Sequence, residues 1–119
     1  MRITSIETYL LECPLERPFG WSQGWATTRA TGLVKLVTDA GVVGWGEGIS
    51  APADAVVGAL FAPLLLGQDP MQRNALWQRM FHALYNANQA VGIGGSAISA
   101  IDTALWDLAG KATGLPVFE

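Results

Sequence analysis

The hydrophobic pattern of this sequence changes its period near residue 50, and that change restricts the chain to few folds. Before it, residues 2–12, 33–37 and 42–45 have the imperfect alternation and the β-forming side chains of strands. A turn at residues 39–41, Asp-Ala-Gly, joins the last two. After it, apolar residues recur about every 3.6 positions, the period of an amphipathic helix. Three strands followed by three helices predict an α+β domain, in which a three-stranded antiparallel meander is followed by a three-helix layer.

Capping residues predict where the helices begin and end. Each helix starts at a cap or at a proline in its first turn: Ser50 and Pro52, Asp69 and Pro70, and Ser96. Pro63 is expected to end or kink the first helix, and Gly114 and Pro116 to end the third. The predicted apolar faces are Leu76, Trp77, Met80, Phe81 and Leu84 in the second helix, and Ile98, Ile101, Leu105 and Leu108, with Ala97, Ala100 and Ala104, in the third.

The most unusual part of the sequence is the segment 17–29. Its glycines, proline and small polar residues predict a loop, and Pro14 and Pro18 are expected to end strand pairing. Trp21 and Trp25 flank Ser-Gln-Gly. Aromatic rings beside amide and hydroxyl groups suit a sugar-like or hydroxy-acid ligand, and the arginine at either end of the segment is able to bind a carboxylate. Packing of the tryptophans onto their own domain is an equally good interpretation of these residues.

Composition excludes several classes of protein. The 119 residues suffice for one compact domain, and half of them are hydrophobic while 14% are charged, as in a well-buried folded unit. A net charge of −3 with scattered lysines and arginines argues against a nucleic-acid partner. The most apolar stretch, 55–66, is shorter than the roughly 20 residues that a membrane-spanning helix needs. A single cysteine, Cys13, excludes an internal disulfide and favours a reduced, cytoplasmic setting.

Four other patterns carry weaker signals. Residues 92–97 match a glycine-rich dinucleotide pattern, but a helix precedes them, whereas such a site needs a strand there. The spacing of the strand carboxylates indicates solvated faces rather than a metal site: Glu7, Glu12, Glu16 and Glu47. Asp107 and Lys111 are spaced for a surface ion pair worth about 0.3–0.5 kcal/mol. Asp102 and Trp106 lie on the third helix away from its apolar stripe, as on a helix between two domains.

Three segments resemble motifs of one known family, in the same order. Residues 44–47 are Gly-Trp-Gly-Glu after a hairpin, and residues 66–70 are Leu-Gly-Gln-Asp-Pro at a helix start. Residues 99–111 are close to the signature A-I-D-x-A-L-W-D-x-x-G-K, and Gly-Leu-Pro follows at 114–116. The sequence thus resembles the mandelate racemase/muconate lactonizing branch of the enolase superfamily, and within it the acid-sugar dehydratases and lactone cycloisomerases.

This resemblance implies an N-terminal capping domain over residues 1–119 and a C-terminal (β/α)8 barrel that is absent from the sequence. Enzymes of the family are lyases or isomerases that remove a proton α to a carboxylate and stabilise the enediolate with Mg²⁺. Their base and metal ligands lie in the barrel, so we expect no catalytic residue, no bound metal ion and no turnover in this chain alone. The implied partners are the barrel, a carboxylate or acid-sugar substrate, and further copies in a homo-oligomer.

The resemblance also implies two loops that close over the barrel and select the substrate. The first contains Phe19, Trp21, Gln23, Trp25 and Thr28, and the second contains Ser50, Pro52 and Asp54. We therefore expect the chain to act as the substrate-specificity lid of a magnesium-dependent enzyme. Two alternatives stay open: a stand-alone, non-catalytic capping fold that self-associates or binds a partner, and a nucleotide-binding module that uses residues 92–97.

Overall fold

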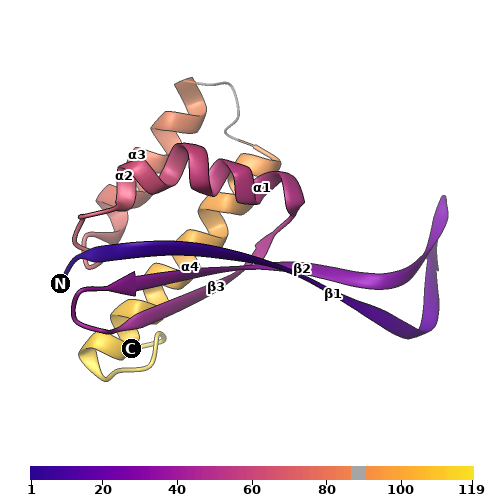
Figure 1. Cartoon of the computed structure of the whole chain (residues 1–119), viewed down its shortest axis with the longest axis horizontal. Helices are drawn as coiled ribbons and strands as arrows, with labels where there is room; N and C mark the ends of the chain where they lie inside the picture. Colours follow the sequence, from indigo (N-terminus) through magenta and orange to yellow (C-terminus); the bar gives the residue numbers. More distant parts are fainter. Residues whose placement is uncertain (87–90) are drawn as a thin grey trace.

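The computed structural model describes residues 1–86 and 91–119, and within them a single antiparallel sheet precedes the helices (Figure 1). The strands, in the order β1-β2-β3, are β1 (Ile3–Trp21), β2 (Gly24–Thr38) and β3 (Val43–Ile49). The predicted turn at residues 39–41 joins β2 to β3, and Gly41 has a φ of +75°, a conformation that favours glycine. The predicted meander is confirmed.

The prediction of a loop at residues 17–29 was wrong, because β1 continues to Trp21 and β2 begins at Gly24. Pro14 does not end the pairing but marks a break in its register. Pro14 pairs with Thr28 and Phe19 pairs with Ala26, so β1 advances five residues while β2 advances two. Since proline has no N–H for the ladder, the extra residues form a bulge, and pairing resumes beyond it.

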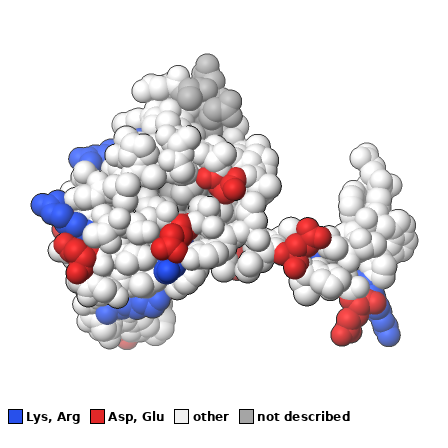
Figure 2. Space-filling model, in the orientation of Figure 1, with Lys and Arg blue, Asp and Glu red and all other residues white. Residues whose placement is uncertain are grey.

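Residues 12–30 form an arm that projects away from the helices and from the rest of the sheet (Figure 1). A narrow neck joins the arm to the body of the domain (Figure 2). None of its residues is buried. The third strand accounts for this geometry, because β3 ends at Ile49, which pairs with Gly32, and the hairpin continues alone from there.

The first helical segment consists of α1 (Ala51–Val56), a π-helical turn η1 (Val57–Phe61) and α2 (Ala62–Leu65). It begins after Ser50 with Pro52 in its first turn, as predicted, although the Ser50 side chain makes no capping hydrogen bond. Pro63 does not end the segment. The preceding turn widens into η1 instead, which is one way for a helix to accommodate a proline that cannot donate a backbone hydrogen bond.

The starts of the other two helices, α3 (Arg73–Asn86) and α4 (Ile93–Thr113), differ from the prediction. Asp69 accepts a hydrogen bond from the Met71 amide at 3.0 Å in a turn before α3, so it does not cap the helix directly. Ser96 lies inside α4, and its hydroxyl donates to the Ile93 carbonyl at 2.8 Å. The end of α4 is as predicted, because Gly114 has a left-handed φ of +70°. Within residues 1–86 and 91–119, no helix has both the length and the apolarity to cross a membrane.

The core lies between the sheet and the helices. The whole predicted apolar face of α4 is buried, together with Val34 and Leu36 of β2 and Phe61 of η1. In α3 the prediction holds only in part, because Leu76, Met80 and Leu84 are buried whereas Trp77 is exposed and stacks on the half-buried Phe81, with ring centroids 5.1 Å apart. A residue next to a buried one on a helix is rotated by about 100°, which takes the Trp77 ring to the rim of the core.

Strand β3 and helix α4 approach so closely that the strand requires two glycines. A Cβ atom at Gly44 would overlap the carbonyl oxygen of Ala104, and a Cβ atom at Gly46 would overlap that of Ala100. Both obstacles are helix backbone, which cannot move aside as a flexible side chain can. Packing therefore explains the two glycines of the first segment of the family resemblance, Gly-Trp-Gly-Glu.

Polar contacts hold the same two elements together. The predicted Asp107–Lys111 pair is confirmed, with the Lys111 ammonium 2.6 Å from a carboxylate oxygen of Asp107. That carboxylate also accepts a hydrogen bond from the Trp45 amide at 2.8 Å, and Lys111 donates to the Val43 carbonyl at 3.0 Å. The pair thus satisfies backbone groups of β3, which is more than the surface ion pair expected from the sequence.

Gly46→Ala should lower the free energy of unfolding by about 3 kcal/mol, because the added methyl group meets rigid helix backbone. Urea denaturation followed by circular dichroism measures the change. Gly58→Ala is the control, since Gly58 lies exposed in a helical turn with no atom within 4 Å of the added carbon. Alanine is the better helix former, so this variant should be at least as stable as the wild type. Equal losses in the two variants would contradict the close approach.

Candidate functional site

The end of the arm presents its aromatic side chains to solvent. β1 and β2 are joined there by Ser22 and Gln23, and the side chains of Phe19, Trp21 and Trp25 are 40%, 57% and 73% exposed. The interpretation that the tryptophans pack this segment onto its own domain is therefore wrong. On the face shown in Figure 2, acidic and basic groups lie along the arm, whereas its far end carries none. The predicted site residues Gln23 and Thr28 are exposed as well.

The two tryptophans lie on opposite faces of the hairpin. Trp21 pairs with Gly24, and its ring lies over that glycine, where a Cβ would be 3.0 Å from the ring. Trp25 pairs with Gly20, and its ring covers Gly20 in the same way at 3.2 Å. Adjacent pairs in a ladder alternate between faces, so the two rings cannot contact one small ligand from the same side. The glycines keep both rings flat against the ribbon.

A row of side chains continues from Trp21 along the arm. The Phe19 ring centroid is 6.2 Å from that of Trp21, and the Arg29 guanidinium carbon lies 4.4 Å from the centroid of the Phe19 ring. The second contact has the geometry of a cation–π interaction. One side of the arm therefore combines two aromatic rings with a positive charge, and this row of Trp21, Phe19 and Arg29 is the best-defined candidate for ligand binding.

The second predicted loop lies at the base of the arm. Ser50 precedes α1, and Pro52 and Asp54 are in its first turns. Ser50 lines a hollow of about 300 Å³ together with Glu12 and Ala30, the residues at which the arm begins. The aromatic row does not line this hollow. The two predicted loops are thus apart in the structure: the second lies at the base of the arm, and the first lies within the arm and at its end.

Sequence reasoning missed a polar cluster on the open face of the sheet. Glu7 accepts hydrogen bonds from the Tyr9 hydroxyl and from Lys35, whose nitrogen is 3.2 Å away. The Trp45 ring closes the group, at 5.8 Å from the Tyr9 ring and 5.8 Å from the Lys35 nitrogen. The Tyr9 hydrogen bond, and then the one from Lys35, lower the pKa of Glu7. Only the pairing of Glu7 with Lys35 across β1 and β2 would have revealed this cluster.

The described residues do not fit a magnesium site. In residues 1–86 and 91–119, no three His, Cys, Asp or Glu side chains are grouped so as to hold a metal ion. Two of the strand carboxylates have protein partners instead, since Glu7 belongs to the cluster above and Glu47 accepts a hydrogen bond from the Thr31 hydroxyl at 2.7 Å.

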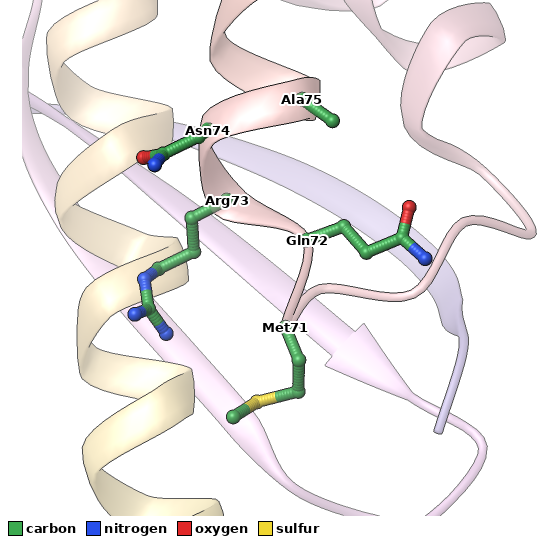
Figure 3. Close-up of a pocket in the computed structure, with 5 residues that line it drawn as sticks. All are labelled: Met71, Gln72, Arg73, Asn74 and Ala75. Carbon is green, nitrogen blue, oxygen red and sulfur yellow. The ribbon is translucent and has the colours of Figure 1, made fainter.

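A second aromatic–arginine contact lies between α3 and α4. The Arg73 guanidinium carbon is 4.0 Å from the centroid of the Trp106 ring, and Figure 3 shows the Arg73 side chain directed toward α4. Burial raises the pKa of Asp102, and the charge of Arg73 opposes that shift. Trp106 is 40% exposed, which agrees with its predicted place away from the core. Next to it lies a hollow of about 330 Å³ lined in part by Leu115 and Val117.

The glycine cluster at residues 92–97 lacks the surroundings of a dinucleotide site. Gly92 is the cap of α4, and Gly94 is buried in its first turn. The element described before it is helix α3, and the sheet is antiparallel. A dinucleotide site requires a strand leading into the glycines within a parallel βαβ unit. The described part of the chain therefore gives no support to the nucleotide-binding alternative.

Comparison with known proteins gives a consistent picture. A profile described as "Mandelate racemase / muconate lactonizing enzyme, N-terminal domain" matches residues 5–119. D-galactarolactone cycloisomerase of Agrobacterium fabrum is 41% identical over 119 residues, and a D-galactonate dehydratase of Verminephrobacter eiseniae is 38% identical over 122. Among solved structures, the 3,6-anhydro-D-galactonate cycloisomerase of Zobellia galactanivorans superposes with a TM-score of 0.83 at 35% identity.

These relatives are much longer than the chain. The alignments cover 98% of the chain and 31% of the galactarolactone cycloisomerase, and 100% of the chain and 27% of the galactonate dehydratase. For the anhydrogalactonate cycloisomerase the shares are 98% and 30%. The chain thus corresponds to less than a third of each relative.

Trp21→Ala and Trp25→Ala should each change the free energy of unfolding by less than about 0.5 kcal/mol, because both rings are largely exposed and cover only glycines of the arm. Chemical denaturation tests this. Leu36→Ala, in the buried part of the same hairpin, should cost about 2–5 kcal/mol. A comparable loss in a tryptophan variant would mean that the ring packs on the body of the domain.

Tyr9→Phe should raise the pKa of Glu7 toward its ordinary value, since the Tyr9 hydrogen bond is the main cause of the lowering. An NMR titration of the Glu7 carboxyl measures this, with Tyr85→Phe on α3 as the control. Because the folded-state pKa lies below the unfolded value, the cluster stabilises the fold above the unfolded pKa, and that contribution disappears as the pH falls through the folded one. An unchanged pKa in Tyr9→Phe would exclude the hydrogen bond as the cause.

Proposed function

This chain belongs to the mandelate racemase/muconate lactonizing enzyme family as its N-terminal domain, and on that basis we propose that it is the substrate-specificity lid of a longer enzyme. The enzyme as a whole depends on Mg²⁺, removes a proton α to a carboxylate and acts on an acid sugar. Its reaction falls within the dehydratase, racemase or cycloisomerase class.

The names of the relatives support the substrate class more than the reaction type. One is a cycloisomerase of D-galactarolactone, another a dehydratase of D-galactonate and a third a cycloisomerase of 3,6-anhydro-D-galactonate. Their reactions differ, whereas all three names denote acids of galactose or derivatives of such acids. A domain shared by different reactions is better suited to recognising the substrate than to performing the chemistry.

The arm is the observation that carries the proposal. It extends from the domain without a single buried residue, so it has no role in the core. It nevertheless carries Phe19, Trp21 and Trp25 in exposed positions, which is unfavourable in water unless another molecule covers them. An arm of this kind, placed over an active site, would exclude water and contact the bound sugar.

A second domain is the proposed partner of the body. Trp106 and the segment after α4 expose large apolar side chains, with Leu115, Val117 and Phe118 exposed by 50%, 56% and 88%. The relatives contain about three times as much chain as this domain, which makes their remaining part the natural cover for this surface. We propose that this part also contains the base and the Mg²⁺ ligands, and that the catalytic activity of the whole enzyme therefore depends on it.

The same exposed side chains favour one alternative, a non-catalytic capping fold that self-associates through this surface. The lid proposal includes association too, because we infer a homo-oligomer for the whole enzyme. The two proposals differ in chemistry: only a lid affects the turnover of a sugar acid.

In the full-length protein that carries this domain, replacing both Phe19 and Trp21 by alanine should reduce kcat/KM for its sugar-acid substrate by roughly 10- to 100-fold, since the bound sugar loses its aromatic cover. Steady-state kinetics with D-galactonate and D-galactarolactone as probes measure the effect. The 119-residue chain by itself should turn over neither compound.

Tyr85→Ala provides the control, because Tyr85 is 66% exposed on α3, away from the arm. It should leave kcat/KM nearly unchanged. Turnover by the isolated domain, or equal kinetics of the Phe19/Trp21 variant and the wild type, would refute the lid function.

A further inference from the structure

We propose that Arg29, together with the Phe19 and Trp21 rings, forms a binding site for the terminal carboxylate of a sugar diacid. This proposal rests on the lid function and narrows its substrate class. The proposed site lies on one face of the arm, and its positive charge is that of Arg29.

Contacts with the arm position the guanidinium of Arg29. The group lies 4.4 Å from the centroid of the Phe19 ring, and the Phe19 and Trp21 centroids are 6.2 Å apart. Stacking on the ring restricts the long arginine side chain without using its N–H groups, which stay available for hydrogen bonds. The positive charge therefore has a defined place at one end of an aromatic surface.

Arg29 has no acidic partner in the described part of the chain. The ion pairs there join Lys35 to Glu7 and Lys111 to Asp107, and no carboxylate lies within 4.0 Å of Arg29. The other stacked arginine, Arg73, differs in this respect, because its charge acts on the nearby Asp102. Arg29 is thus a stacked cation that is still free to bind an anion.

The chemistry of the row matches a sugar acid held by one end. An arginine fork binds a carboxylate through two parallel hydrogen bonds, and an aromatic ring covers the apolar face of a sugar. In the proposed reaction one carboxylate is adjacent to the carbon that loses its proton, and it is bound by the second domain, which supplies the base and the Mg²⁺ ligands. The described residues contain no group of three side chains that could hold that metal ion. A carboxylate bound by Arg29 is therefore a second one, at the far end of the molecule. A sugar diacid has such a group, whereas its monolactone keeps only one free carboxylate and an aldonic acid ends in a neutral hydroxymethyl group.

Arg17 provides a matched comparison on the same arm. It has the same charge and is also exposed, but it lies in the bulge between Pro14 and Phe19. The cation–π contacts of the described residues involve Arg29, Lys35 and Arg73, and Arg17 is not among them. In the described part of the chain, no cation–π contact holds the Arg17 guanidinium beside the aromatic row, so Arg17 tests whether charge on the arm is sufficient.

The experiment compares D-galactarate with D-galactonate, which share a carbon skeleton and differ in one terminal group. Binding of both by the full-length protein is measured by calorimetry, and kcat/KM is measured where turnover occurs. We expect the wild type to prefer the diacid and Arg29→Gln to weaken diacid binding by roughly 10- to 100-fold, with less than about threefold change for the monoacid. Arg29→Lys should retain part of the preference, because it keeps the charge but not the fork. Arg17→Gln should retain all of it.

Four results would overturn the proposal. Equal weakening of both ligands by Arg29→Gln would assign Arg29 a structural role, and an equal effect of Arg17→Gln would mean that unspecific charge attraction is responsible. A wild type that turns over D-galactonate and does not bind D-galactarate would exclude the diacid while leaving the lid function intact. A protein that binds and turns over no sugar acid would contradict both.

Discussion

The close contact of β3 with α4 is the constraint on which the rest of the structure depends. Gly44 and Gly46 let the strand lie directly against the helix backbone at Ala104 and Ala100. With α4 in this position, its apolar face meets Val34 and Leu36 of the central strand, and the other helices complete the layer. Asp107 and Lys111 then satisfy backbone groups of β3 at the edge of the sheet.

The same contact determines where the arm begins. Helix α4 packs mainly on β3 and also contacts β2, and β3 ends opposite Gly32. Beyond that point β1 and β2 have neither a third strand nor a helix, so their side chains are free of packing requirements. Exposed rings such as Trp21 and Trp25 cost little stability there, since they never contribute to the core. The fold thus separates a part that provides stability from a part that is available for recognition.

Features that depend on local spacing could be predicted from the sequence, whereas those that depend on pairing between strands could not. The apolar face of α4 and its end at Gly114 follow from periodicity and from a single backbone conformation. The prediction of a loop at residues 17–29 failed because glycine and proline report local preference, and cross-strand hydrogen bonds outweigh it. The opposite orientation of the two tryptophans, and the cluster of Glu7 with Lys35, depend on the register of β1 against β2, which composition does not reveal.

A paired hairpin and a flexible loop differ in the free energy that must be spent on ordering them when a ligand binds. In a flexible lid, each contact side chain and the backbone beneath it must be ordered on binding, which consumes part of the binding free energy. In this arm the ladder fixes the order of Phe19, Trp21 and Trp25, the glycines hold the rings flat, and the Phe19 ring positions Arg29. Much of this free energy of ordering is spent when the domain folds, not when the ligand binds.

A movement of the arm would also leave the aromatic row intact. Pairing is irregular between Pro14 and Phe19, so the paired end would move as a rigid unit and the bending would occur in that irregular segment. Under the proposal above, selectivity depends on which side chains occupy the row, and a single substitution at Arg29 would change it without altering the fold.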